Sequence, residues 1–94
     1  MSLPQPDREI KGGYCGDLLS WVMGRAEADS AWITIMTNVN IAAVSALADI
    51  AVVIIAEGAR PDADVIETAI AKGINILLTQ DTAFNTAVKI SKDI

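Results

Sequence analysis

The sequence predicts an α/β fold, a three-layer sandwich in which helices flank a mainly parallel sheet of three or more strands. Two observations support this prediction. Three short apolar runs have the length of strands buried in a sheet, around Trp32, over residues 51–56 and over residues 74–78. A stretch that can form a helix of about ten residues follows each run, and this alternation is typical of parallel strands joined by right-handed crossovers.

The chain ahead of the first run is predicted to contribute one helix. Residues 8–11 can form a short strand, and Gly12 and Gly13 permit a turn with positive φ. Asp17 is suited to the cap or first turn of a helix that ends near Gly24. Five of six consecutive side chains after Asp17 are apolar, so this helix is predicted to be apolar over most of its circumference.

The first run is predicted to be a strand that breaks at Thr37 and Asn38. An alanine-rich helix then spans residues 39–48 and has almost no charged face. Residues 51–56 are apolar throughout, as expected of a central parallel strand that is buried on both faces. The small side chains of the alanine-rich helix would let it approach the sheet, or another helix, closely.

Two amphipathic helices are predicted to follow the second and third runs, and Gly73 is predicted to cap the C-terminus of the first of them. The expected N-caps are Asp62 or Asp64 for the first helix and Asp81 or Thr82 for the second. The expected buried stripes are Val65, Ile66, Ala69 and Ile70 in the first helix and Ala83, Phe84, Ala87 and Val88 in the second.

Length and hydropathy indicate a single domain that has apolar surface to spare. We expect a domain over residues 7–94, after an extended or disordered lead-in or cloning remnant over residues 1–6, which hold two of the three prolines. A chain of this size buries only roughly 60–65% of its unfolded surface. Yet 52% of the residues are hydrophobic and the mean hydropathy is +0.41. We therefore expect packing on both sides of the sheet and a partner surface.

Charge and residue usage exclude several classes of function. A net charge of −5 with scattered basic residues argues against binding nucleic acid. The absence of histidine removes the commonest metal ligand and general base, and the single Cys15 rules out an intrachain disulfide, so no metal is expected. The sequence has neither a run of the ~18–20 apolar residues that span a membrane nor a secretory signal, and we expect a cytoplasmic protein.

Polar side chains gather where the three predicted strands end. Parallel strands end at one edge of the sheet, where helix N-termini suit a small polar or anionic ligand. The candidate ligand-binding residues are Thr37, Asn38, Asn40, Glu57, Arg60, Thr79 and Asp81. The alternative is that these residues are caps and turn formers, which every α/β domain needs. Arg60 could bind phosphate or carboxylate, or form a salt bridge with Glu57 or Asp62.

The sequence contains no recognisable catalytic motif. The glycines Gly12, Gly13 and Gly16 do not fit the spacing of a phosphate-binding loop, and no Lys-Ser or Lys-Thr pair follows them. The serines have no histidine to activate them, and Cys15 is interpreted as a small buried hydrophobe. We therefore expect no catalytic residue and no cofactor.

The two helices without a solvent face predict self-association. One apolar stripe on each helix is explained by the sheet, but a second stripe is not. We expect a homodimer, with a further protein partner as an additional possibility, and no partner among nucleic acids or membranes. The candidate interface residues are Leu18, Trp21, Val22 and Val44.

Four segments resemble the DRTGG domain family, and together they cover most of residues 7–94. The matching segments are DREIKGGYCGDLLSWVMGRA (7–26), AWITIMTNVNIAAVSALAD (31–49), AVVIIAEGARPDADVIETAIAKGINILLT (51–79) and TAFNTAVKI (82–90). The literal DRTGG string is absent, because three residues separate Asp7-Arg8 from Gly12-Gly13.

The resemblance implies a regulatory or dimerising module without established chemistry. Members of the family occur alone, beside CBS domains in regulated pyrophosphatases, attached to phosphotransacetylase-like proteins and near iron-only hydrogenase genes. The resemblance thus implies a non-catalytic role linked to hydrogenase or phosphate metabolism. Small stand-alone relatives are sometimes labelled HPr serine kinases, a label that the missing phosphate loop argues against here. The alternative function is a sensor that binds a nucleotide or another anion at the edge described above.

Overall fold

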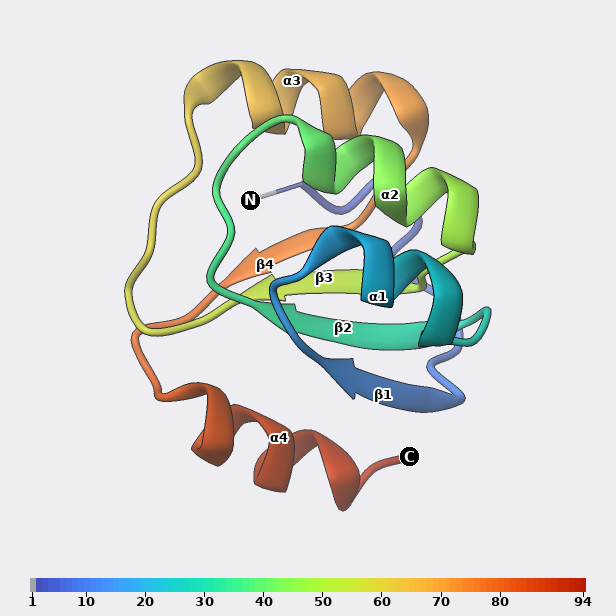
Figure 1. Cartoon of the computed structure of the whole chain (residues 1–94), viewed down its shortest axis with the longest axis vertical. Helices are drawn as coiled ribbons and strands as arrows, with labels where there is room; N and C mark the ends of the chain where they lie inside the picture. Colours follow the sequence, from blue (N-terminus) through green and yellow to red (C-terminus); the bar gives the residue numbers. More distant parts are fainter. Residues whose placement is uncertain (1) are drawn as a thin grey trace.

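The computed structural model describes residues 2–94 and contains a sheet of four parallel strands in the order β1-β2-β3-β4 (Figure 1). The strands are β1 (Gly12–Cys15), β2 (Ser30–Thr34), β3 (Val52–Ile55) and β4 (Ile76–Leu78). The helices are α1 (Leu19–Arg25), α2 (Asn40–Ala48), α3 (Ala63–Lys72) and α4 (Ala83–Ser91). The predicted α/β fold is confirmed.

The layers on the two faces of the sheet are unequal. Helices α1, α2 and α3 cover one face, and α4 alone lies against the other (Figure 1). A parallel strand order that never reverses places its crossover helices on one face when all crossovers have the same hand. Helix α4 follows the last strand and is not a crossover, so it is free to fold beneath β1 and β2.

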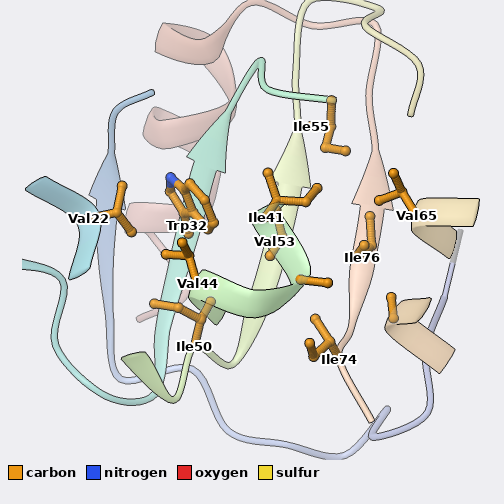
Figure 2. Close-up of a cluster of buried hydrophobic side chains, with 12 residues drawn as sticks. Val22, Trp32, Ile41, Val44, Ile50, Val53, Ile55, Val65, Ile74 and Ile76 are labelled. Carbon is orange, nitrogen blue, oxygen red and sulfur yellow. The ribbon is translucent and has the colours of Figure 1, made fainter. Parts of the chain in front are cut away.

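The larger part of the core lies under the three crossover helices (Figure 2). Trp32 is fully buried there, and its indole N–H donates to the carbonyl of Gly16 at 2.8 Å. The smaller cluster, on the α4 face, is formed by Ala31, Ile33, Val52, Ile54 and Ala56. Every residue of β3 is buried, which confirms the prediction of a central strand buried on both faces.

The first strand lies where the sequence predicted a turn. β1 is Gly12–Cys15, not residues 8–11, and neither Gly12 nor Gly13 has a positive φ. Because two adjacent glycines have weak β propensity, this strand depends on pairing with β2. β2 provides a full parallel ladder, with Gly12 opposite Ser30 and Cys15 opposite Ile33.

The predicted lead-in packs against the body of the domain; Met1 lies outside the described residues. Ser2 forms an antiparallel bridge with Ile76 of β4, and Gln5 is hydrogen-bonded to Asn75. Farther along, the guanidinium of Arg8 pairs with Asp29 and Asp49. Burial by itself would lower the pKa of Arg8, but these two carboxylates outweigh it, and the pKa is raised.

Three of the predicted caps are confirmed in position and one is wrong. Asp62 is the N-cap of α3, although its side chain forms no capping hydrogen bond. Gly73 ends α3 with φ of 73°, and Thr82 caps α4 by accepting a hydrogen bond from the N–H of Asn85. The N-cap of α1 is Leu18, without a side-chain bond, and not Asp17. The carboxylate of Asp17 instead accepts hydrogen bonds at the end of β2, so tertiary contacts outweigh its local capping preference.

Parts of the predicted buried stripes are exposed. Phe84 of α4 is 76% exposed, Val88 is also exposed, and Ile70 of α3 is 56% exposed. The residues of α4 that pack on the sheet are Ala83, Ala87 and Ile90. Glu57 accepts a hydrogen bond from the backbone N–H of Ala83 at 3.0 Å, which helps to fix the start and rotation of α4. Within residues 2–94, none of the helices combines the length and apolar character needed to cross a bilayer.

Candidate functional site

The polar edge predicted from the sequence exists at the C-terminal ends of the strands. Because β2, β3 and β4 are parallel, the loops that follow them leave the sheet on the same side (Figure 1). Residues 35–39, 56–62 and 79–82 form these loops. The two loops after β3 and β4 are joined by backbone hydrogen bonds, in which Glu57 donates to Asp81 and Gly58 donates to Thr79.

The loop after β2 uses its polar side chains to begin α2. The side-chain oxygen of Asn38 accepts a hydrogen bond from the backbone N–H of Asn40 at 2.9 Å, as in an Asx turn. Asn38 and Asn40 are exposed, and Thr37 is half-buried. The structure therefore supports the turn-forming role that the sequence left open for Asn38.

The loops after β3 and β4 are locked by their own side chains. Glu57 has a positive φ of 62° and binds the first N–H of α4 through its carboxylate. The hydroxyl of Thr79 accepts a hydrogen bond from the N–H of Asp81 at 3.1 Å, and Asp81 forms an ion pair with Lys89. Three of the seven candidate residues thus have an internal partner here, which leaves them less free for a ligand.

Arg60 is the candidate residue whose side chain stays available to a ligand. It is exposed, and no ion pair links it to another described residue, so the predicted alternative of a salt bridge with Glu57 or Asp62 is not formed. A cleft of about 90 Å³ lies beside it, lined by Gly58, Ala59, Arg60, Leu78, Thr79 and Gln80. Of the seven candidates the cleft includes Arg60 and Thr79 alone. It is smaller than the pockets of roughly 300–1,000 Å³ that hold whole small molecules.

Asp17 is the polar residue at this edge that sequence reasoning assigned elsewhere. Its carboxylate accepts hydrogen bonds from the hydroxyl of Thr34 at 2.7 Å and from the backbone N–H of Ile35 at 3.0 Å. These bonds tie the loop after β1 to the end of β2. The signal that could have located it is the position of Asp17 two residues beyond a strand, but the sequence did not reveal that strand.

Titratable groups are not concentrated into a reactive centre in the described part of the chain. No group of three or more His, Cys, Asp or Glu residues among residues 2–94 could hold a metal ion. Partial burial, together with the negative charge of Asp17, raises the pKa of the Cys15 thiol, which favours the unreactive protonated form. Cys15 is exposed on β1, whereas the sequence had suggested a buried position.

The four predicted interface residues fall into two groups. Leu18 and Trp21 are exposed, and the guanidinium of Arg25 stacks on the Trp21 ring at 3.7 Å. Val22 and Val44 are almost fully buried in the core cluster, so they offer no surface to a partner (Figure 2). Helical periodicity alone did not separate the two groups, because neither helix shows a polar face.

Comparison with known sequences identifies the family. No curated protein matches the chain. The family model of the DRTGG domain, however, matches residues 19–92, which span the chain from the start of α1 to the end of α4. With such a match over most of its length, this chain belongs to the DRTGG domain family.

Proposed function

We propose that this chain is a non-catalytic regulatory domain that acts as a homodimer. The DRTGG domain is a regulatory domain family, which makes a regulatory role the natural starting point. The observation that carries the dimer is the apolar surface beside α1, where Leu18 and Trp21 are both exposed. Large apolar side chains that stay exposed close together mark protein interfaces more often than they mark ordinary surface.

The environment of Trp21 supports a binding role. Arg25 covers one face of the indole and holds the ring in place, so little conformational entropy is lost when a partner contacts it. Tryptophan and arginine are also the residues that most often dominate the binding energy of interfaces. An interface that includes this pair would use a preformed anchor.

Sedimentation velocity across micromolar concentrations tests this proposal. We expect a dimer for the wild-type chain and a shift to monomer for Trp21→Glu, because the apolar ring that anchors the interface is lost and a charged side chain takes its place. Ile70→Glu on α3 is the matched control, since Ile70 is similarly exposed but lies on another helix. A wild-type chain that sediments as a monomer at these concentrations would contradict the dimer.

The biological setting that we propose is the control of hydrogenase-linked or phosphate metabolism, and its support is the family resemblance alone. Purification of the tagged chain from its native cells tests the setting. Recovery of a hydrogenase component or a phosphate-handling enzyme would support it. Recovery of neither at stoichiometric yield would contradict it.

A second candidate function is the sensing of a small anion beside Arg60. The observation that favours it is the exposed guanidinium at the cleft of about 90 Å³, without an ion pair among residues 2–94. The size favours a phosphate group over a complete nucleotide. Thermal unfolding with inorganic phosphate or with adenine nucleotides should show a rise in Tm that Arg60→Ala abolishes and Asn38→Ala leaves intact. No rise with either ligand would contradict sensing.

A further inference from the structure

The outer edge of β1 is open. β1 is the terminal strand of the sheet, and no strand among the described residues pairs with it on the side away from β2 (Figure 1). The opposite edge differs, because Ser2 bridges β4 at Ile76. An open edge presents a row of unpaired N–H and C=O groups, which is a template for another strand. β1 itself contains no charge and no proline, which are the usual devices that block such pairing.

The hydrogen bonds of β1 indicate which groups point outward. The N–H of Gly16 donates to the carbonyl of Ile33 in β2 at 3.2 Å. Backbone groups alternate in direction along a strand, so the N–H and C=O groups of Tyr14 also point toward β2. The N–H and C=O groups of Gly13 and Cys15 therefore point away from the sheet. Gly13 and Cys15 are both exposed.

We infer that β1 pairs in an antiparallel manner with β1 of a second copy of this chain, about a two-fold axis at Tyr14. This inference rests on the proposed homodimer and specifies how that dimer is built. Gly13 of one copy then lies opposite Cys15 of the other, and the two residues exchange both backbone hydrogen bonds. The same contact recurs on the other side of the axis, as a closed two-fold interface requires. The two sheets become one continuous sheet.

The length of β1 selects this register, because Gly13 and Cys15 are the two residues of the strand whose backbone groups point outward. With the axis at Tyr14 these two residues pair with each other, so each outward N–H and C=O group of β1 has a partner within the strand. An axis at Gly13 would pair Cys15 with Lys11, whose N–H is already bonded to Asp29. An axis at Cys15 would pair Gly13 with Asp17, whose carboxylate is already bonded to Thr34, so either shift carries the pairing past the ends of β1.

The side chains on both faces of β1 fit the same pairing. On the face of α1, the two Tyr14 rings lie beside each other at the axis, and Tyr14 already packs on the core cluster that contains Trp32. On the face of α4, a groove of about 380 Å³ runs along β1, lined by Gly12, Gly13, Cys15, Ala31, Ile33, Ala87, Ile90, Ser91 and Ile94. The added strand would extend the sheet at the open side of this groove. Leu18 follows β1 closely, so the pairing also brings the exposed surface of α1 toward the axis.

An engineered cross-link tests the register directly. A side chain at Gly13 is tolerated, since its φ is ordinary and a Cβ there would approach nothing closer than the carbonyl oxygen of Ala31 at 3.7 Å. In Gly13→Cys the new thiol would face the native Cys15 of the second copy across a hydrogen-bonded pair, with Cα atoms about 5.5 Å apart, within reach of a disulfide. We expect Gly13→Cys to form a covalent dimer under mild oxidation, seen by intact mass and non-reducing electrophoresis.

Two matched controls make the cross-link specific. In the wild-type chain the two Cys15 residues lie diagonally, about 7–8 Å apart, and should not cross-link. Gly13→Cys combined with Cys15→Ala has the same diagonal geometry at residue 13 and should also stay non-covalent. Efficient cross-linking of the wild-type chain would place the axis at Cys15 and overturn the register. Equal cross-linking of all three proteins would indicate random collision and overturn the pairing.

A second variant removes an outward hydrogen bond without a cross-link. Cys15→Pro deletes the outward N–H, and proline is tolerated on the free side of an edge strand. We expect the dissociation constant of the dimer to rise about tenfold or more relative to Cys15→Ala, with far-ultraviolet circular dichroism unchanged. If Cys15→Pro and Gly13→Cys leave a stable, non-covalent dimer, edge pairing is wrong while the proposed homodimer stands. If the wild-type chain is a monomer, the proposed homodimer itself fails.

Discussion

One edge of the sheet, at β4, is covered by the N-terminal segment, and the other edge, at β1, is open. At β4 the N-terminal segment adds a bridge through Ser2, with backbone bonds of 3.0 and 2.6 Å to Ile76, and the Ser2 hydroxyl donates to the carbonyl of Ile74. At β1 the edge is open, and two of its four residues are glycine. The strand sequences explain the difference. β4 reads ILL and would aggregate readily if it stayed open, whereas GGYC has weak intrinsic β propensity.

Protection of a sheet edge need not be local in sequence. β4 is closed by residues more than seventy positions away, and the contact is secured by Asn75, which is buried and bonded on both its amide atoms. β1 needs no such cover, since a glycine-rich edge gains little from non-specific pairing. It can therefore stay available for one specific partner strand.

The largest expected effect concerns the anchor of the closed edge. Asn75 accepts from the N–H of Gln5 and donates to the carbonyls of Gln5 and Ala51. Asn75→Leu should lower the free energy of unfolding by about 2–3 kcal/mol, because the buried carbonyl of Ala51 loses a side-chain partner and the N-terminal segment is released. Urea denaturation measures this. Asn85→Leu on the exposed side of α4 is the control and should change stability by less than about 0.5 kcal/mol.

If Asn75→Leu were as stable as wild type, the N-terminal segment would contribute nothing to closing β4. A loss of stability without a rise in aggregation would separate the two roles, since it would show that the segment stabilises the fold without being needed to guard the edge.

A smaller effect is expected at Gly73, which lies where α3 meets the closed edge. Its φ is 73°, and a Cβ would approach the side-chain nitrogen of Gln5 at 3.2 Å. Gly73→Ala should destabilise the fold by about 1–2 kcal/mol, through backbone strain and disturbance of the N-terminal segment. Gly24→Ala is the opposite control, because nothing lies within 4 Å of its Cβ position in α1. It should stabilise by up to about 1 kcal/mol. Equal signs for the two variants, measured by thermal unfolding, would contradict this reasoning.

The smallest effect concerns the thiol at the open edge. Because partial burial and Asp17 raise the pKa of Cys15, its thiolate fraction at pH 8 is lower than that of a free thiol. Alkylation by iodoacetamide should therefore be slower than for glutathione at pH 8 and should accelerate as the pH rises through the raised pKa. Dilution below the dimer dissociation constant should also accelerate alkylation, since it exposes the edge. A rate that is independent of protein concentration would count against pairing at β1.

The candidate site was predictable in position but not in availability. Residues after parallel strands converge on one edge by topology, and the structure brings Glu57, Thr79 and Asp81 together there. Whether a polar side chain is free depends on its partners. The partner of Glu57 is the N–H of Ala83, and that of Asp81 is Lys89. Both partners lie in α4, whose rotation the sequence pattern predicted wrongly, because Phe84 and Val88 look like core residues.

The alternation of apolar strands and helices, and with it the parallel α/β fold, follows from the amino-acid pattern, because a strand that is apolar on both faces can be buried only between layers. The sequence also specifies where α3 ends and where α4 begins, since Gly73 and Thr82 act on their own neighbours. The first strand and the protection of the sheet edges depend instead on tertiary contacts. β1 exists because β2 pairs with Gly12 and Gly13, and the opposite edge is closed because Ser2 reaches Ile76. These contacts join distant parts of the chain, so local propensity could not reveal them.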